Sequence, residues 1–223
     1  MTQYYCNELC IVYNGSINKL HYQMEVQAHG NKYEDIKTRE LTGLSKKEYD
    51  KLKKNGYTSV FDISKGLHSD VDISIKTTGG NSVNSGDIRR MRSHSEYDLI
   101  VAQWEQVTPT KKVFHTEYRF HIKPEHEELL WGTMNYDLLN EFNEYIRGYN
   151  GREDRDARKQ ERQEYQNQIQ DDNALMKINP KPSQRRTQCT VHIDKLIASG
   201  VEYSVKPIRI ELQSTPRKRN KKK

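Results

Sequence analysis

The 223-residue sequence is poor in cysteine and in apolar residues. Its three cysteines, Cys6, Cys10 and Cys189, are an odd number and too few for a disulfide framework, which favours free thiols in a reducing compartment. Hydrophobic residues make up 33% of the chain, and no apolar run approaches the roughly 20 residues that span a bilayer. The start of the sequence shows no basic region followed by an apolar segment, so no signal peptide is expected. We therefore expect a cytoplasmic protein that does not contact a membrane.

Several common catalytic motifs are also missing. The sequence has no glycine-rich phosphate loop, which argues against a nucleotide cofactor, and no serine or cysteine nucleophile elbow. His115 and His121 share a face of one expected strand, but no finger-like spacing or acidic partner accompanies them. Surface or half-buried histidines are the simpler interpretation.

The charge balance is basic, and the excess gathers at the end of the sequence. Lysine and arginine number 37 against 31 acidic residues, which gives a net charge of +6. Residues 214–223 are expected to form a disordered basic tail, and six of the last seven residues are Lys or Arg. Such a tail suits a solubilising role, a phosphate contact, or a nuclear address in a eukaryotic or viral setting.

The hydrophobic pattern predicts an α/β fold with a mixed central sheet flanked by helices. Gly30 falls inside the first expected helix, so two shorter helices are the alternative there. Ser45 and Glu48 form a capping-box pattern at the start of the second. Helices are expected over 17–40, 46–54, 136–149 and 194–198, and strands over 59–63, 70–76, 97–104, 112–122, 174–178, 187–193 and 206–212.

Changes in composition suggest four segments. Residues 1–150 contain one core, and 151–172 form an almost wholly polar helix or connector. Residues 173–213 form a C-terminal β element, which is expected to make an accessory sheet, and 214–223 are the basic tail.

The segment Asp70–Lys76 alternates polar and β-branched residues. In a strand, Asp70, Asp72, Ser74 and Lys76 would share one face, because successive side chains point to opposite sides. Carboxylates that lie close together repel each other unless a cation joins them, and magnesium prefers oxygen ligands. Metal-assisted phosphodiester hydrolysis needs such carboxylates and a cation beside the phosphate. The alternative is a solvated edge strand.

The residues after this segment favour the first interpretation. A polar loop offers backbone and hydroxyl donors for phosphates, and a basic helix follows it. The candidate DNA contacts in these two elements are Thr77, Thr78, Asn81, Ser82, Arg89 and Arg90.

The segment resembles the PD-(D/E)XK nuclease superfamily, which includes most type II restriction endonucleases. There a β-hairpin carries one acidic residue, and later a second acidic residue, any residue and lysine. The resemblance assigns the lysine to Lys76 and the first acid to Asp70, with Asp62 as its rival. The sequence departs from the pattern at Ser74, where the superfamily has a carboxylate. Either Asp72 substitutes for it from two residues back on the same face, or Ser74 and a water complete the metal shell, and the number of metal ions is left open.

The superfamily often adds a glutamate from its first helix. Gly30–Ile36 resembles that helix, because a glycine and an aromatic residue precede the acid. The resemblance therefore implies a role for Glu34, with Asp35 as the less favoured choice and a bland surface glutamate as the alternative. Catalytic residues would then be Asp70, Asp72, Lys76 and Glu34, and the three acids would hold Mg²⁺.

A second basic loop lies between two expected C-terminal strands. Arginine pairs with guanine and glutamine with adenine in the major groove, so such a loop can read base edges. It is similar to a C-terminal strand-loop-strand in some small restriction enzymes, although a solvated turn would look the same. The candidate DNA contacts here are Lys181, Gln184, Arg185, Arg186 and Gln188.

Together these features predict a restriction-endonuclease-like core with a C-terminal DNA-contacting element. The expected function is that of a type II restriction endonuclease, a homodimer that cuts double-stranded DNA at a short palindrome with Mg²⁺. A structure-selective repair or junction-resolving nuclease and a non-catalytic DNA-binding protein are the alternatives.

Overall fold

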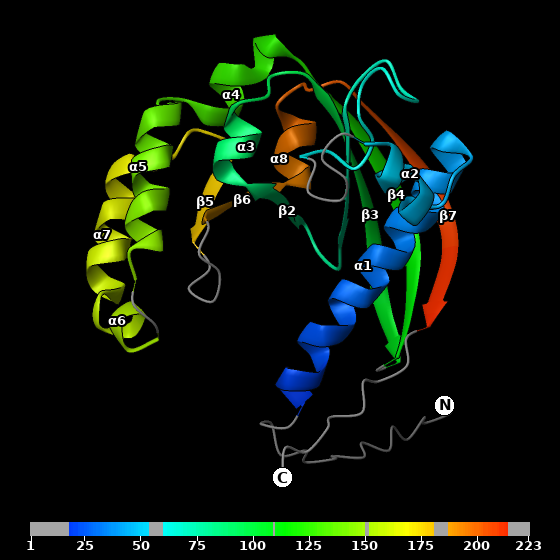
Figure 1. Cartoon of the computed structure of the whole chain (residues 1–223), viewed down its shortest axis with the longest axis horizontal. Coiled ribbons are helices and arrows are strands. Elements are labelled where there is room, and N and C mark those ends of the chain that lie inside the picture. Colours follow the sequence, from blue (N-terminus) through cyan, green and yellow to red (C-terminus); the bar gives the residue numbers. More distant parts are fainter. Residues whose placement is uncertain (1–17, 54–59, 109, 150–151, 181–186, 214–223) are drawn as a thin grey trace, which may run out of the picture.

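A four-stranded mixed sheet forms the centre of the molecule. The computed structural model describes residues 18–53, 60–108, 110–149, 152–180 and 187–213. Strand β1 (Ile73–Thr78) is parallel to β3 (Tyr97–Thr108), which pairs antiparallel with β4 (Lys111–Ile122), and β4 pairs antiparallel with β7 (Tyr203–Gln213). The order is β1-β3-β4-β7 (Figure 1). The predicted mixed sheet is therefore confirmed.

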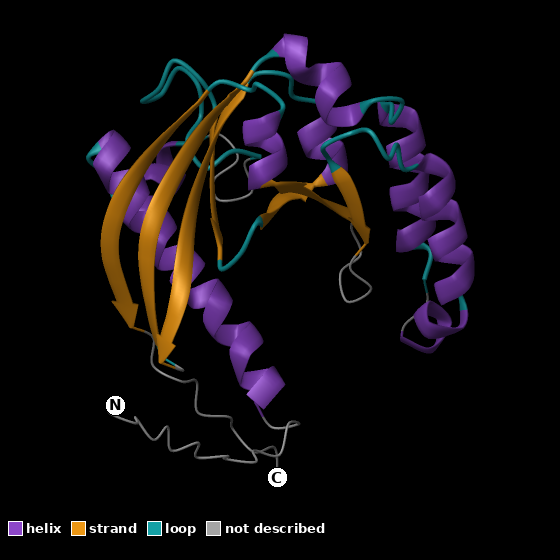
Figure 2. Cartoon of the chain, turned by 180° about the vertical axis from the view of Figure 1, so that it is seen from behind, coloured by secondary structure: helices purple, strands orange, loops and turns teal. Residues whose placement is uncertain are grey.

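Helix α1 (Asn18–Thr42) lies across one face of this sheet (Figure 2). Tyr33 stacks on Phe114 of β4 with 4.9 Å between ring centroids, inside a cluster that includes Ile73 and Ile75. Gly30 does not interrupt the helix. A Cβ at that position would lie 3.3 Å from the Thr77 hydroxyl oxygen, so glycine allows the helix to approach β1 closely.

The opposite face packs against a second, antiparallel sheet and two short helices. This sheet has the order β2-β6-β5 and consists of β2 (Ser82–Asp87), β6 (Thr187–His192) and β5 (Lys177–Pro180). Its neighbours are α3 (Ile88–Arg92), capped by the Asp87 carboxylate, and α8 (Ile193–Ala198). The larger hydrophobic core joins these elements to the main sheet, with Leu99, Val101 and Phe120 among its members.

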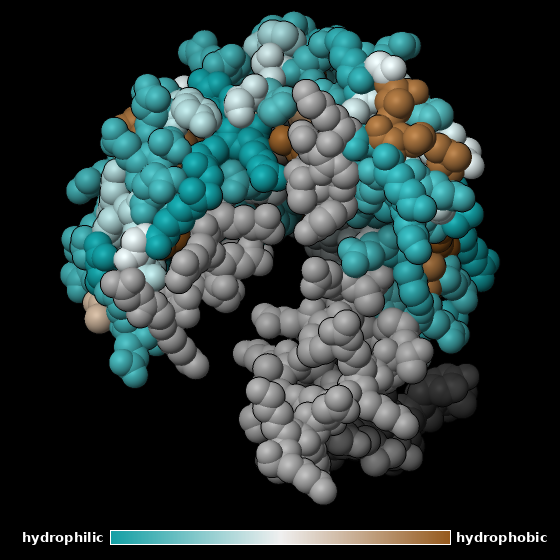
Figure 3. Space-filling view, in the orientation of Figure 1, coloured by the Kyte–Doolittle hydropathy of each residue, from teal (hydrophilic) through white to brown (hydrophobic). Residues whose placement is uncertain are grey.

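The remaining helices form the edges of the molecule. Helix α2 has the predicted capping box of Ser45 and Glu48, and α5 and α7 pack through Phe142 and Tyr165. The bounds are α2 (Lys46–Leu52), η2 (Pro124–His126), α4 (Glu127–Trp131), α5 (Tyr136–Arg147), α6 (Arg152–Ala157) and α7 (Lys159–Ile169). The main sheet with α1, and the helices α5 and α7, form two arms with an open hollow between them (Figure 3). The described surface around the hollow is mostly hydrophilic.

Several strand predictions differ from the structure, and the strand expected over 174–178 lies at Lys177–Pro180 as β5. Within residues 60–63 only Ile63 forms a β-bridge, with Ile73, in place of the strand expected over 59–63. The strand expected over 70–76 begins at Ile73, because the preceding residues form a turn. Strand β2 was not predicted, since its sequence is polar and glycine-containing.

The C-terminal strands do not form one accessory sheet. Strands β5 and β6 join β2, whereas β7 pairs with β4 in the main sheet. The main sheet therefore needs a strand from outside residues 1–150. In the described part of the chain, no helix is long and apolar enough to cross a membrane.

A buried ion-pair cluster fastens α1 to the main sheet. Glu117 of β4 accepts hydrogen bonds from Tyr33 and from Lys37, whose Nζ lies 2.8 Å away, and Lys206 of β7 lies 3.2 Å from it. Burial by itself would raise the pKa of Glu117, but the hydrogen bonds from Lys37 and Tyr33 outweigh it and hold the pKa below its usual range. The Lys37 and Glu117 side chains are only 5% and 7% exposed.

We predict that Glu117→Gln lowers the free energy of unfolding at pH 7 by roughly 2–3 kcal/mol, less than the ~3–5 kcal/mol of a fully unpaired buried charge, because the Lys37 ammonium keeps Glu40 as an acidic partner at 2.9 Å. A carboxyl with a lowered pKa stabilises the fold above its usual pKa of about 4.3, and this contribution is lost as the pH falls through the lowered value. Urea unfolding at pH 7 and pH 3 should show the variant converging on the wild type in acid. Glu105→Gln, at an exposed position of β3, is the control. An equal gap at both pH values would contradict the prediction.

Candidate active site

The carboxylate of Asp62 lies along the free edge of β1. Asp62 donates its backbone N–H to the carbonyl oxygen of Ile73 at 2.9 Å, and Ile63 forms the neighbouring bridge. The backbone N–H of Ile75 then donates to Asp62 Oδ2 at 2.6 Å. A side chain therefore takes the place of a strand partner at this point of the sheet edge. This fixes Asp62 beside the middle of β1.

The ammonium group of Lys76 meets the same carboxylate. Its Nζ lies 3.3 Å from Asp62 Oδ2 and 3.1 Å from the carbonyl oxygen of Ile75. Both side chains keep some contact with solvent, at 24% and 17% exposure. Lys76, the predicted lysine, thus lies beside Asp62, which the sequence analysis gave as the alternative to Asp70 for the first acid.

Glu34 reaches this point from α1. Its carboxyl group shares a hydrogen bond with that of Asp62. Burial, then the charge of Asp62, raises the pKa of Glu34 to about 7. Burial would also raise the pKa of Asp62, but the charge of Lys76 and the hydrogen bonds from Glu34 and Ile75 lower it. Of the two carboxyl groups, Glu34 therefore takes up a proton first as the pH falls, and Asp62 stays ionised.

A second lysine balances the charge at Glu34. Nζ of Lys46, the first residue of α2, lies 3.1 Å from Glu34 Oε1. It also contacts both oxygens of Asp50, at 2.7 and 2.8 Å. Sequence reasoning missed both residues as members of the site, although Lys46 and Asp50 have the i, i+4 spacing of a helical ion pair.

Ser74 occupies the position where the sequence departs from the superfamily pattern. It is buried in β1, and its hydroxyl oxygen has no hydrogen-bond partner in the described part of the chain. By strand alternation it lies on the same face as Lys76. Ile73 and Ile75, on the other face, pack under α1.

Asp70 and Asp72 lie outside the strand that was expected to align them with Lys76. Asp70 is exposed. Asp72 Oδ1 accepts the backbone N–H of Lys65 at 2.8 Å and closes the turn before β1. Because β1 starts at Ile73, alternation does not place these two acids on the face of Lys76. The geometry favours Asp62 over Asp70 for the first acidic position.

The polar loop after β1 uses many of its groups internally. Thr78 Oγ1 donates to the carbonyl oxygen of Ser82 at 2.8 Å, and Thr77 lies under Gly30 of α1. Asn81 Oδ1 accepts the backbone N–H of Asp194 at 3.0 Å and so fixes the start of α8. The loop therefore ties β1, β2 and α8 together.

The predicted basic DNA contacts differ in accessibility. Arg89 Nη1 lies 3.2 Å from Asn140 Oδ1 and 3.2 Å from Glu144 Oε1, whereas Arg90 is exposed. Gln188 is buried in β6, where its side-chain oxygen accepts from the Asn84 amide at 2.5 Å. Four predicted contacts lie outside the described residues: Lys181, Gln184, Arg185 and Arg186.

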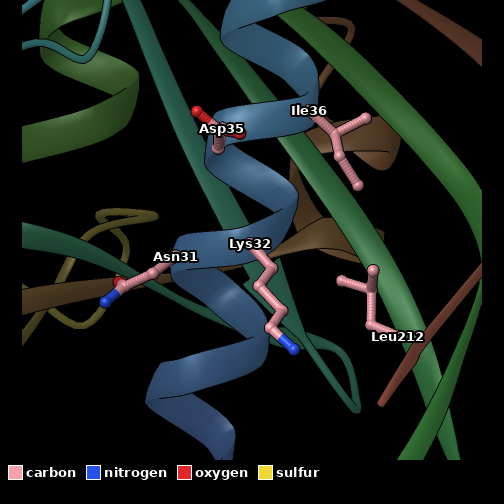
Figure 4. Close-up of a pocket in the computed structure, with 5 residues that line it drawn as sticks. All are labelled: Asn31, Lys32, Asp35, Ile36 and Leu212. Atoms are coloured by element: carbon pink, nitrogen blue, oxygen red, sulfur yellow. The ribbon is translucent and has the colours of Figure 1, made fainter. Parts of the chain in front are cut away.

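A shallow pocket of about 360 Å³ lies on α1, but none of the clustered acids or lysines lines it. Its walls come from α1 and β7, and Lys32 and Ile36 lie on the side of the helix that faces Leu212 (Figure 4). Glu34, Asp62 and Lys76 are therefore the better candidate for chemistry.

The residues present fit a magnesium ion held by few protein ligands. The described residues contain no group of three or more His, Cys, Asp or Glu side chains arranged to hold a metal. Magnesium, however, usually keeps several waters and takes only one or two carboxylates. Glu34 and Asp62 lie within hydrogen-bonding distance of each other, so these two carboxylates would supply the protein ligands of such an ion.

We predict that Glu34→Gln changes how stability depends on pH. Between about pH 4.3, the usual pKa, and about pH 7, the folded wild type keeps a proton that the unfolded chain releases. Its stability therefore falls as the pH rises through this range. From pH 5 to pH 8 the free energy of unfolding of the variant should gain roughly 2–3 kcal/mol relative to the wild type. Urea unfolding in EDTA checks this, and a difference that is constant across the range refutes it.

Comparisons of the chain with models of protein families, with curated proteins and with solved structures found no match.

Proposed function

We propose that this protein is a magnesium-dependent endonuclease that hydrolyses phosphodiester bonds in double-stranded DNA, in the manner of type II restriction enzymes. The observation that carries the proposal is the convergence of Glu34, Asp62 and Lys76 from three separate segments at the edge of β1. Two carboxylates in contact with each other and beside a lysine are the protein groups that metal-assisted phosphodiester hydrolysis needs.

Each side chain has a distinct part in this chemistry. Glu34 and Asp62 would hold Mg²⁺, which supplies a Lewis acid for the phosphate and lowers the pKa of a coordinated water. Lys76 places a positive charge 3.3 Å from Asp62 Oδ2, where it stabilises negative charge that develops on the phosphate. The Ile75 N–H holds Asp62 in place and keeps it ionised.

The shape of the molecule suits a polymeric substrate. The described surface around the hollow between the two arms is mostly hydrophilic (Figure 3). Arg90 on α3 is exposed. Duplex DNA attracts basic proteins through its phosphates, and the net charge of the chain is +6. Arg185 and Arg186, which lie outside the described residues, would read bases, and a homodimer would match a palindrome.

We expect Asp62→Asn and Lys76→Ala to lower the rate of plasmid cleavage with Mg²⁺ by at least about 100-fold, because each removes a charge needed in the transition state. Asp70→Asn should keep the rate within about threefold, since Asp70 is exposed and outside β1. Initial rates on supercoiled plasmid measure both effects. If Asp70→Asn is inactive and Asp62→Asn is active, the assignment of the first acid reverts to Asp70.

DNA binding separates an enzyme from a non-catalytic binding protein. Lys76→Ala should bind duplex DNA in Ca²⁺ within about fivefold of the wild type, whereas Arg90→Ala should weaken binding to every sequence and reduce its salt dependence by about one phosphate contact. Fluorescence anisotropy at several salt concentrations measures this. Wild-type protein that leaves varied plasmid and genomic DNA intact with Mg²⁺ would refute the nuclease proposal.

The runner-up nuclease recognises DNA structure instead of sequence. Such an enzyme needs little base reading, so substitutions at Arg185 and Arg186 would leave its choice of site unchanged. Loss of sequence preference in these variants supports the restriction class, and preferential cutting of branched DNA by the wild type supports the runner-up.

A further inference from the structure

Helix α2 touches both segments that supply the acids, although it supplies no acid to the site itself. Lys46 and Asp50 fall at i and i+4 on one face of the helix, and Lys53 is the C-cap residue that follows its last residue. The capping box of Ser45 and Glu48 fixes where the helix begins. The three charged residues therefore occupy defined positions.

One end of this face holds α1. Lys46 Nζ lies 3.1 Å from Glu34 Oε1. The backbone N–H of Lys46 donates to Asp35 Oδ1 at 2.7 Å, one residue further along α1. The first turn of α2 is thus fastened to α1 at Glu34.

The other end holds the segment that carries Asp62. Lys53 Nζ lies 3.4 Å from the carbonyl oxygen of Phe61 and 3.3 Å from that of Asp62. Tyr49, fully buried on the same helix, accepts the backbone N–H of Ser64 at 3.0 Å. The backbone on both sides of Asp62 is therefore bound to α2.

Asp50 joins the two ends. It contacts Lys46 Nζ through both oxygens, and its Oδ1 lies 2.7 Å from Lys53 Nζ. The Lys53 side chain is only 2% exposed, so its ammonium depends on Asp50 for a counter-charge. The Lys46 ammonium is attracted both to Glu34 and to Asp50, and the balance of these two ion pairs sets its position.

We propose that Asp50 is a positioning residue of the metal site: through Lys46 and Lys53 it sets the separation of Glu34 and Asp62, and with it the affinity for Mg²⁺. The inference rests on the proposed function. Without Asp50, Lys46 has only Glu34 as an acidic partner and competes with the metal for it, and Lys53 releases the backbone at Asp62.

The alternative is that the network only stabilises the fold, and a pair of variants separates the two. Asp50→Asn leaves Lys53 buried and unpaired, so it is expected to lose stability. The double variant Asp50→Asn with Lys53→Met removes both charges and keeps the volume. Replacing a buried ion pair by apolar groups of similar volume is often neutral for stability.

The experiment measures Mg²⁺ alone binding to the full chain by calorimetry at pH 8, where Glu34 is ionised. Asp62→Asn should abolish binding. Asp50→Asn and the double variant should each bind Mg²⁺ about tenfold more weakly, with plasmid cleavage recovering to within about threefold of the wild-type rate at saturating Mg²⁺. Glu161→Gln, which removes an exposed helical ion pair with Arg158, is the matched control and should bind as the wild type.

The outcomes are distinguishable. A double variant that is as stable as the wild type but still binds Mg²⁺ weakly supports the positioning role. One that is stable and binds Mg²⁺ with wild-type affinity overturns it while leaving the proposed function intact. A wild type that does not bind Mg²⁺ overturns both.

Discussion

The hydrogen bond from the Ile75 N–H to the Asp62 carboxylate is the contact on which the candidate site depends. An edge strand leaves backbone donors unpaired, and a buried donor without an acceptor costs about 1–3 kcal/mol. Here the Asp62 carboxylate accepts this hydrogen bond from the Ile75 N–H. One group therefore both pairs the edge of the sheet and supplies an acid to the candidate site. Ile75 directly precedes Lys76 in β1, so the same bond places the Asp62 carboxylate beside the Lys76 side chain. Their ion pair therefore follows from the geometry of the strand.

The charges around that bond are nearly balanced. Two acids lie between two lysines, and below about pH 7 a proton on Glu34 compensates for the repulsion within the acid pair. A divalent cation and a phosphate diester together carry one net positive charge, which equals the charge of one proton. Exchange of the proton on Glu34 for both would therefore change the net charge of the site little. The arrangement therefore suits an anionic substrate that arrives with a divalent metal, as the proposed function requires.

The sequence predicted local features well and long-range pairing poorly. The capping box of α2 and the apolar run of β3 each report on a few neighbouring residues, whereas the sequence left open whether Gly30 divides α1. The bond between Asp62 and Ile75 spans 13 residues across a turn, and no periodicity records it. The sequence pattern of alternating polar residues extends back through Asp72 and Asp70, so it predicted a longer strand. Asp72 is instead needed in the turn, where its carboxylate accepts the Lys65 N–H.

The departure at Ser74 follows from packing. Its face of β1 meets the larger core, where Leu99 and Val101 are fully buried, and Ser74 itself is 1% exposed. A carboxylate there would need a buried partner, because an unpaired buried charge costs several kcal/mol. The second acid can instead come from α1, which Gly30 brings within contact distance of β1. In the proposed site, Glu34 would supply the second carboxylate in place of residue 74, and Lys76 would supply the positive charge.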